Sequence, residues 1–452
     1  MYHTTGSGCT GESRTSSLVT GMRTTQFVVE GGCRLAGTIR PSGNKNAALP
    51  ILAACLLTDQ KVTLDNVPRI ADIEILVELM RSVGAEVEWT AQNALAVQAR
   101  EVRAASLDAA LCARIRASIL LAGPLLARCG EVWLPPPGGD VIGRRRVDTH
   151  LLALAQLGAT VAFDGAYHLA AAALRGADVF LDEPSVTGTE NALMAATAAR
   201  GTTTLRNAAS EPHVQDLAHF LRALGASIEG IGTNTLTVHG GEPLHGAGHA
   251  IGPDHIEVGS FIGLAAVTGS TLRIAGAGVE HLRATRLGFD RLGIACSIEG
   301  NDLLVSATQS RTIQSDVGGH IPKLEDQPWP GFPADLMSIA IVVATQCSGL
   351  ILMHEKMFES RLFFVDKLIG MGARIVLCDP HRALVAGPSE LRGATVESPD
   401  IRAGMAMLLA AMCAVGTSTI NNVGQIDRGY ERIDERLNAL GARIRRVTEG
   451  RA

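Results

Sequence analysis

The hydrophobic and polar positions of this chain repeat one local pattern, in which an amphipathic helix ends at Leu-Gly-Ala or a similar triplet and a strand follows. Two examples are QLGATVAF around Gly158 and ALGARIRRV around Gly441. A glycine at this place can adopt the left-handed backbone of a helix C-terminal cap. The alternation of polar and apolar residues after it, as in Ala442-Arg443-Ile444-Arg445, predicts a strand with one buried face. The pattern occurs six times, at Gly84, Gly158, Gly225, Gly293, Gly372 and Gly441.

The spacing of these six glycines indicates an internal repeat of about 70 residues. A second pattern, a β-branched strand directly after a glycine, occurs within the repeats, as in Gly201-Thr-Thr-Thr-Leu and Gly416-Thr-Ser-Thr-Ile. A single Leu-Gly-Ala triplet is common in any helix–strand protein, but six at nearly constant spacing favour one supersecondary unit in six copies. Because 452 residues exceed what one core usually holds, we expect two α/β domains of three repeats each.

The composition excludes several classes of protein. With 40 basic and 45 acidic residues the net charge is −5, and no basic block longer than Arg144-Arg145-Arg146 occurs, so a nucleic-acid partner is not expected. No apolar run reaches the roughly 18 residues of a membrane span. The nine cysteines form no CxxC pair, which argues against a zinc or redox site and fits thiols in a reducing cytoplasm. Residues 1–25 are rich in Gly, Ser and Thr without a signal-peptide core, and we expect a disordered extension.

Six such repeats in two domains are similar to the architecture of the enolpyruvyl transferases, and the phrase Pro41-Ser-Gly-Asn-Lys45-Asn46-Ala-Ala-Leu-Pro resembles a signature of this family. The closest resemblance is to the branch that acts on UDP-N-acetylglucosamine in peptidoglycan synthesis. It implies a two-domain inside-out α/β barrel of six βαβ-type repeats, because in this family the chain starts in one domain, crosses to the other and returns. Residues 26–44 and 253–452 would form one domain, and residues 45–252 the other, with an active-site loop at 135–146.

The same resemblance implies a set of cations for phosphoenolpyruvate. A lysine or arginine taken alone is more often a helix-end or surface residue, but together these match the family's motifs in separate repeats. Phosphoenolpyruvate carries a carboxylate and a phosphate, which arginine side chains can hold with two parallel hydrogen bonds. The side chains must then converge between the domains, where two-domain enzymes usually bind substrates. The expected phosphoenolpyruvate-binding residues are Lys45, Arg116, Arg145, Arg361, Arg402 and Arg428.

The loop Pro135-Pro-Pro-Gly138-Gly139-Asp140 carries the most informative departure from the family. Its glycines are similar to those of a phosphate-binding P-loop, but the Lys-Ser/Thr that completes that motif is absent, which excludes a nucleotide triphosphatase. Most relatives have Cys where this chain has Asp140, and that residue protonates the methylene carbon of phosphoenolpyruvate. An aspartic acid in water has a pKa of about 3.9 and rarely holds a proton at pH 7. We therefore hypothesise that the bound anion shifts the proton onto Asp140 and so completes the acid.

Two other interpretations of the catalytic carboxylates remain open at this point. Asp140 follows two glycines and could be a turn residue only. Asp335, in the phrase Phe332-Pro-Ala-Asp335, could be an acid at a helix N-terminus only. The resemblance implies instead that Asp335 accepts the proton of the sugar 3-hydroxyl and that Lys45 also contributes to catalysis. A carboxylate at 140 is a poor nucleophile, so we predict insensitivity to fosfomycin, which alkylates the cysteine of relatives.

The resemblance also implies contacts for the nucleotide sugar. Glu183 stands where some relatives have Lys, Thr187 where Gly is common, and His255 where Arg occurs in some. The expected UDP-N-acetylglucosamine-binding residues are Asn46, Arg116, Arg145, Arg146, Val147, Asp148, Ser185, Val186, Thr187, Asp335 and Met357.

The expected function is therefore transfer of the enolpyruvyl group from phosphoenolpyruvate to UDP-N-acetylglucosamine, with release of phosphate. The expected partners are these two small molecules, with no metal or other cofactor, no nucleic acid and no membrane, and the expected state is a monomer or weak homo-oligomer. Two alternatives are an enolpyruvyl transferase for another acceptor, such as shikimate 3-phosphate or another nucleotide, and a non-catalytic UDP-sugar sensor. Only the aspartate at position 140 supports the sensor.

Overall fold

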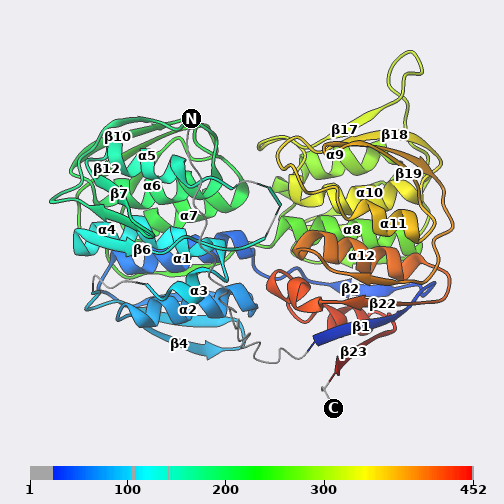
Figure 1. Ribbon diagram of the computed structural model, residues 1–452, viewed down its shortest axis with the longest axis horizontal. Coiled ribbons are helices and arrows are strands. Elements are labelled where there is room, and N and C mark those ends of the chain that lie inside the picture. Colours follow the sequence, from blue (N-terminus) through cyan, green and yellow to red (C-terminus); the bar gives the residue numbers. More distant parts are fainter. Residues whose placement is uncertain (1–23, 104–106, 141, 144, 450–452) are drawn as a thin grey trace, which may run out of the picture.

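The computed structural model describes residues 24–103, 107–140, 142, 143 and 145–449. Most of the expected extension 1–25, and positions 141 and 144 of the loop 135–146, therefore lie outside the described residues. The described chain forms two lobes that lie side by side (Figure 1). Each lobe has its own hydrophobic core, one built from residues 47–251 and the other from residues 27–39 together with 256–444. We call these lobe A and lobe B.

Lobe A contains three sheets, with the strand orders β13-β3-β5-β4, β6-β8-β7 and β11-β12-β10-β9. Its helices are α1 (Lys45–Ala54), α2 (Ala71–Ser82), α3 (Ala109–Cys112), α4 (Ala122–Cys129), α5 (Asp148–Gln156), α6 (Val186–Ala198) and α7 (Pro212–Ala223), with 3-10 turns η1 (Cys55–Leu57) and η2 (Arg116–Leu121). Its strands are β3 (Val62–Asp65), β4 (Glu86–Ala91), β5 (Ala94–Gln98), β6 (Glu131–Leu134), β7 (Thr160–Phe163), β8 (Tyr167–Ala170), β9 (Asp178–Phe180), β10 (Gly201–Arg206), β11 (Ser227–Glu229), β12 (Thr235–Gly240) and β13 (Gly248–Ala250).

Lobe B also contains three sheets, with the orders β21-β22-β1-β23, β15-β16-β14-β2 and β17-β18-β20-β19. Its helices are α8 (His255–Thr268), α9 (Arg283–Arg291), α10 (Met337–Thr345), α11 (Val365–Gly370), α12 (Ile401–Cys413) and α13 (Ile433–Asn438), with 3-10 turns η3 (Val279–His281), η4 (Ala334–Leu336) and η5 (Val423–Arg428). Its strands are β1 (Thr24–Glu30), β2 (Ala36–Ile39), β14 (Thr271–Ile274), β15 (Cys296–Glu299), β16 (Asp302–Val305), β17 (Lys323–Glu325), β18 (Gly349–His354), β19 (Arg374–Asp379), β20 (Arg382–Gly387), β21 (Thr395–Glu397), β22 (Thr417–Asn421) and β23 (Ile444–Glu449).

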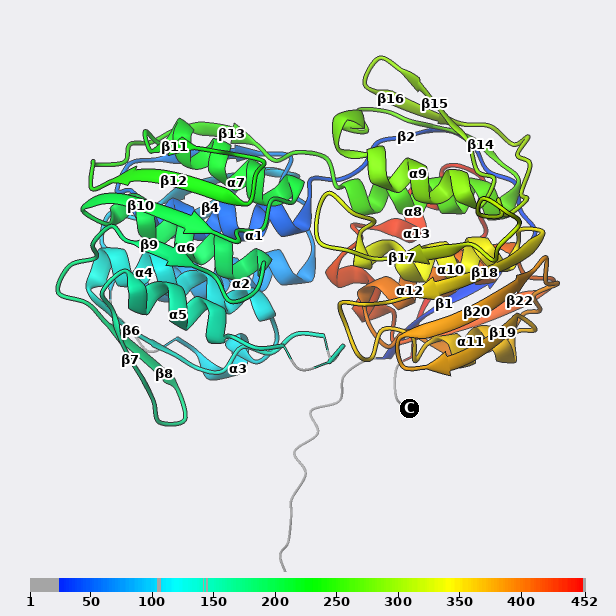
Figure 2. The same ribbon diagram turned by 90° about the horizontal axis from the view of Figure 1, so that it is seen from above.

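Helices lie inside each lobe and sheets lie outside. In lobe B, α8, α10 and α12 pack against one another, and nearly every residue of the three is buried. A helix that is apolar on all sides must be covered on all sides, and the three sheets supply this cover (Figure 2). Strands of this cover alternate between buried and more exposed residues, as β14 and β18 do. This arrangement confirms the expected two-domain inside-out α/β fold.

The six glycines of the repeated phrase all have positive φ, from 75° at Gly293 to 106° at Gly225 and Gly372. The prediction that each ends a helix in the left-handed conformation is therefore confirmed. A residue with positive φ avoids steric strain when it has no Cβ atom. This explains why glycine stands at this position in every copy of the repeat.

The chain passes between the lobes at two adjacent segments. Gly43 and Pro253 pair as an antiparallel bridge, the Asn44 amide donates to the Gly252 carbonyl (2.8 Å), and the Asp254 amide donates to the Ser42 carbonyl (2.9 Å). We propose that the domains meet here, with residues 26–44 and 253–452 in one and 45–252 in the other. No helix in the described residues combines the length and apolar composition needed to cross a membrane.

Candidate active site

A buried carboxylate from lobe A links cations from the two lobes. Asp72, in the first turn of α2, lies 2.6 Å from the Lys45 ammonium and accepts a hydrogen bond from Arg428 Nε at 2.9 Å. Lys45 begins α1, whose first turn is capped by the Asn44 side chain, which accepts from the Asn46 amide at 2.8 Å. Burial alone would raise the pKa of Asp72, but the two cations hold it below its usual value. This pairing fixes Lys45 beside Arg428 across the gap between the lobes.

A second carboxylate, Asp335, is held by two arginines of lobe B. One carboxylate oxygen of Asp335 accepts from Arg402 Nε at 2.9 Å, and the other is ion-paired with Arg361 Nη2. Burial opposes ionisation, but Arg402 and Arg361 lower the pKa of Asp335. The Arg361 guanidinium also lies over the Phe358 ring, and the Arg402 guanidinium over the Tyr430 ring. Asp335 is therefore a charged, tightly held carboxylate in this state of the protein.

Two of these guanidinium nitrogens are buried and bond to nothing in the described residues. They are Arg361 Nε and Arg402 Nη1. A buried cationic donor without an acceptor is costly, and the oxygens of an anion are acceptors of the kind that these nitrogens lack. Both arginines are more than nine-tenths buried, so bulk water has little access to them. Arg361 and Arg402 therefore each carry an unfilled donor of the kind that an anionic ligand requires.

The loop of lobe A reaches across to lobe B (Figure 1). Asp140 is ion-paired with Arg428 Nη1, and the Ile142 carbonyl accepts a hydrogen bond from the Ser360 amide at 3.3 Å. At the base of the loop, Gly138 packs so closely on the Ala113 carbonyl that a Cβ atom would lie 1.7 Å from it. The loop therefore rests on the segment that carries Arg361 and covers the gap between the lobes.

Arg116 and Arg145, which lie next to the loop, have different structural roles. Arg116 Nη2 donates to the carbonyls of Arg145 (2.8 Å) and Arg146 (2.6 Å), so it holds the end of the loop. Burial, and then the charge of Arg145, lower the pKa of Arg116 to about 10. Burial also lowers the pKa of Arg145, which interacts electrostatically with Asp140, Asp335, Arg361 and Arg428. The charge of Arg145 therefore acts on carboxylates from both lobes.

The residues expected to bind the nucleotide sugar lie mainly at the starts of α5 and α6, which pack against each other. Arg146 pairs with Asp148 and Asp182, each at 3.1 Å, and Val147 is buried. Ser185 is the N-cap of α6, where its hydroxyl accepts from the Gly188 amide. The Thr187 hydroxyl lies 3.0 Å from His150 Nε2. Val186 is the first residue of α6, Asn46 follows Lys45 in α1, and Met357 is 41% exposed near Arg361.

The sequence analysis missed Asp72, although it joins two of the cations that were identified. Its only signal in the sequence is an acidic residue in the first turn of a helix, which the helix dipole explains without any function. It also missed Asn44, whose side chain caps α1 and lies 3.1 Å from His255 Nδ1 in lobe B. Each of the two residues has one partner more than 200 positions away in the chain, Arg428 for Asp72 and His255 for Asn44.

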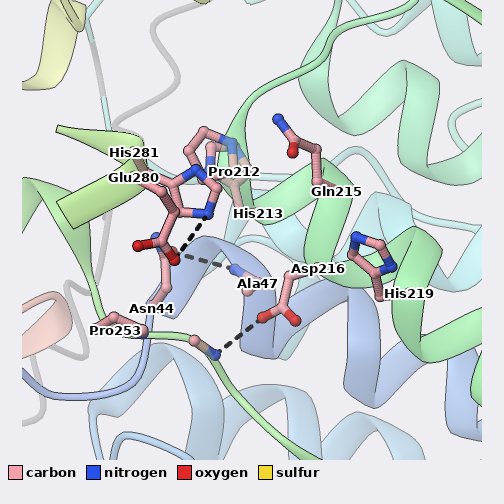
Figure 3. Close-up of a pocket in the computed structure, with 11 residues that line it drawn as sticks. Asn44, Ala47, Pro212, His213, Gln215, Asp216, His219, Pro253, Glu280 and His281 are labelled. Atoms are coloured by element: carbon pink, nitrogen blue, oxygen red, sulfur yellow. Dashed lines mark hydrogen bonds and ion pairs between the residues drawn. The ribbon is translucent and has the colours of Figure 1, made fainter. Parts of the chain in front are cut away.

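A hollow of about 150 Å³ lies beside the two crossing segments (Figure 3). The His213 ring stacks on the His255 ring at 5.9 Å, and burial lowers the pKa of each to about 3. The Asp216 carboxylate accepts from the Gly252 amide at 3.0 Å. No group of His, Cys, Asp and Glu in the described chain is arranged to hold a metal ion. The residues that line the hollow are Asn44, Ala47, Pro212, His213, Gln215, Asp216, His219, Gly252, Pro253, Glu280 and His281.

Comparison with known proteins agrees with the fold and identifies the family. The family described as EPSP synthase (3-phosphoshikimate 1-carboxyvinyltransferase) matches residues 29–437, and the chain belongs to this family. A relative from Bradyrhizobium diazoefficiens is 73% identical over 94% of this chain and 98% of its own length. A second, from Treponema denticola, is 54% identical over 93% of this chain and 98% of its own length. Both are named UDP-N-acetylglucosamine 1-carboxyvinyltransferase. The resemblance to the enolpyruvyl transferases, and the enzyme class that it implied, are confirmed.

Solved structures give the same fold. The enolpyruvyl transferase NikO from Streptomyces tendae superimposes with a TM-score of 0.82 at 26% identity, over 95% of this chain and all of that one. EPSP synthase from Acinetobacter baumannii superimposes with a TM-score of 0.72 at 17% identity, over 94% of this chain and all of that one. The second similarity is one of fold alone.

Proposed function

We propose that the protein transfers the enolpyruvyl group of phosphoenolpyruvate to the 3-hydroxyl of UDP-N-acetylglucosamine, a reaction of peptidoglycan synthesis. The observation that carries the proposal is the pair of buried, unpartnered nitrogens on Arg361 and Arg402, beside a carboxylate that can accept a proton. The names of the relatives at 73% and 54% identity support the choice of substrates. The carboxylate and phosphate of phosphoenolpyruvate supply the acceptors that these arginines lack.

In the first step the sugar 3-hydroxyl adds to C2 of phosphoenolpyruvate. Asp335 takes the hydroxyl proton as the new C–O bond forms, and Asp140 gives a proton to C3, which becomes a methyl group. In the structure the Asp335 carboxylate is ion-paired with Arg361 and Arg402. An arriving anion competes for the same guanidinium groups, which frees Asp335 to act as a base.

In the second step the ionised Asp140 takes a proton back from the methyl group and the C–O bond to phosphate breaks, while the proton on Asp335 leaves with the phosphate. The electron pair of the C–H bond forms the new C=C bond, so the products are the enolpyruvyl ether and inorganic phosphate. Arg145, Arg428 and Lys45 would stabilise the negative charge on the departing phosphate. Asp72 orients Arg428, and the phosphate would take the place that Asp140 holds on this side chain.

The nucleotide sugar would bind between the loop end and the start of α6. The contacts that we propose for it are Asn46, Arg116, Arg145, Arg146, Val147, Asp148, Ser185, Val186, Thr187, Asp335 and Met357. Ser185 caps a 13-residue helix and Thr187 lies in its first turn, where the backbone dipole favours a phosphate group. In the structure Arg146 pairs with the exposed carboxylates of Asp148 and Asp182, which a diphosphate could displace.

Release of phosphate tests the proposal. The protein with phosphoenolpyruvate and UDP-N-acetylglucosamine should release one phosphate for each enolpyruvyl ether formed, and neither substrate alone should give phosphate. Replacing the acceptor by shikimate 3-phosphate should give none. Phosphate release with shikimate 3-phosphate but not with the UDP-sugar would assign the other acceptor, and binding of the UDP-sugar without any turnover would identify a sensor.

We also propose that the enzyme works in the cytoplasm, as a monomer or a weak homo-oligomer. The eight cysteines of the described residues are all free thiols, which suits a reducing compartment. Cell fractionation and the sedimentation of the purified protein over a range of concentrations would test the two statements separately.

A further inference from the structure

The carboxyl groups of Asp326 and Glu355 lie side by side near Arg361 and have no part in the mechanism proposed above. Strands β17 and β18 pair in parallel, with Glu325 opposite His354. Asp326 directly follows β17 and Glu355 directly follows β18. The two acidic residues therefore stand next to each other at the carboxyl ends of neighbouring strands. Both side chains are completely buried, with 0% exposure. Two acidic side chains are thus placed together in the interior by strand register alone.

The two carboxyl groups have unequal surroundings. Asp326 accepts hydrogen bonds from the amides of Lys356 (2.5 Å) and Met357 (3.3 Å). Neither side-chain oxygen of Glu355 receives a hydrogen bond from the residues that the structure describes. Asp326 therefore has two hydrogen-bond donors, whereas an ionised Glu355 would be buried without a donor. One proton on Glu355, pointing at Asp326, would remove the repulsion and satisfy both groups.

We propose that Asp326 and Glu355 share a single proton, and that this carboxyl pair is a positioning device for the segment 356–361, which carries Met357 and Arg361 into the active site. Asp326 holds the start of that segment through two backbone amides, and the shared proton keeps Asp326 from being repelled by its neighbour. A second carboxylate charge at Glu355 would also draw Arg361 away from Asp335. The role in positioning substrate contacts rests on the proposed function, whereas the shared proton does not.

The electrostatic surroundings of Glu355 support this assignment. Burial is the largest influence and, with the hydrogen bond and charge of Asp326, raises the pKa of Glu355 to about 9. Arg361 acts in the opposite direction, and the charge of Asp335 on η4 adds to the rise. The Lys356 ammonium lies 3.7 Å from Glu325 and so is paired with a different carboxylate. His381, in the turn between β19 and β20, forms a hydrogen bond of 2.8 Å through Nδ1 with the backbone carbonyl of Glu355. Glu355 is therefore protonated at neutral pH and loses its proton only in alkaline solution.

Infrared spectroscopy of the full-length protein tests the shared proton without any substrate. The difference spectrum between wild type and Glu355→Gln at pH 7 should contain the carbonyl band of one protonated carboxylic acid, and this band should disappear with a midpoint near pH 9. The exposed Glu390→Gln variant should lose only a carboxylate band. Absence of a protonated acid band at pH 7 in the Glu355→Gln difference would overturn the proposal, whatever the enzyme's activity.

Steady-state kinetics tests the positioning role. Glu355→Ala should raise the KM for phosphoenolpyruvate about tenfold with a smaller change in kcat, while Glu355→Gln, which mimics the protonated acid, should restore KM to within about threefold of wild type at pH 7. The fall in kcat/KM that Glu355 causes above pH 9 should be absent from the glutamine variant. If Glu355→Gln keeps the same alkaline fall, or is as defective as alanine, Glu355 does not act through a shared proton. Because the infrared result does not need turnover, failure of the proposed reaction is distinguishable from failure of this inference.

Discussion

Asp140, on the loop of lobe A, is ion-paired with Arg428 of lobe B. The same guanidinium group donates to Asp72 through Nε at 2.9 Å and to Gln425 through Nη1 at 2.9 Å. The residue that we propose as the acid is thus held, in the absence of substrate, by a cation that would also hold the substrate. In the mechanism that we propose, an incoming phosphate competes with Asp140 for Arg428.

Replacement of Asp140 tests its role as the acid. Asp140→Ala should lower kcat by about 100-fold or more, because general acid catalysis typically contributes a factor of this size. Asp140→Cys should retain turnover, since a thiol can also donate a proton. Phosphate release measures both, with the exposed Asp164→Ala as control. Turnover of Asp140→Ala close to that of wild type would leave Asp140 as a turn residue only.

The same position decides the response to fosfomycin. The wild-type protein should keep its mass and its activity in the presence of the drug, because a carboxylate is a poor nucleophile for alkylation. Asp140→Cys should be labelled once and inactivated, as intact-mass spectrometry would show. The wild type contains other free thiols, such as the exposed Cys378, so labelling must be mapped to position 140 by peptide analysis.

Arg402 should dominate the affinity for phosphoenolpyruvate. Arg402→Ala should lower kcat/KM for this substrate by about 100-fold, because a buried charged contact is lost and Asp335 is left with one cation. Arg402→Lys keeps the charge but not the planar fork and should be intermediate. Arg392, whose side chain is 80% exposed, offers a control, and Arg392→Ala should change kcat/KM by less than about twofold. An unchanged KM for phosphoenolpyruvate in Arg402→Ala would contradict the proposed site.

Asp72 should be important for stability as well as for function. Asp72→Asn leaves Lys45 and Arg428 close together without their shared carboxylate, and we expect a loss of about 3 kcal/mol in the free energy of unfolding. Glu74→Gln, in the same helix, removes a partly exposed partner of Arg69 and should cost less than about 1 kcal/mol. Chemical denaturation at pH 7 measures both. Equal effects of the two variants would show that Asp72 is not the buried link described above.

The buried histidines should make the protein sensitive to acid. The pKa of His213 is lowered to about 3 by burial, so its contribution to stability is complete above its unfolded value near 6.5 and is lost as the pH falls toward 3. His213→Gln should reduce the slope of unfolding free energy against pH by about 1.4 kcal/mol per unit between pH 6 and 4. His219→Gln, an exposed residue of the same helix, should leave the slope unchanged. An unchanged slope in His213→Gln would mean that His213 is not held neutral.

Much of the fold was predictable from local sequence because its cause is local. A glycine must end each repeated helix, since only glycine adopts positive φ there without steric strain, and Gly84, Gly225 and Gly441 all do so. The buried helices could be recognised by continuous apolar composition, as in α10 (Met337–Thr345). The sequence alone also identified Lys45, Asp140, Asp335 and the arginines as candidates, through their match to family motifs. Their catalytic and binding roles remain predictions.

The sequence by itself determined the repeat, the two-lobe α/β architecture and the family, because helix caps, apolar periodicity and motifs depend on neighbouring residues. Only the tertiary structure decided which charges meet. Asp72 and Arg428 are 356 positions apart, and Asp326 and Glu355 are 29 apart with no local signal that joins them. Electrostatic interactions and pKa shifts depend on distances of a few ångströms and on burial, and these are set when the two lobes and their strands pack together.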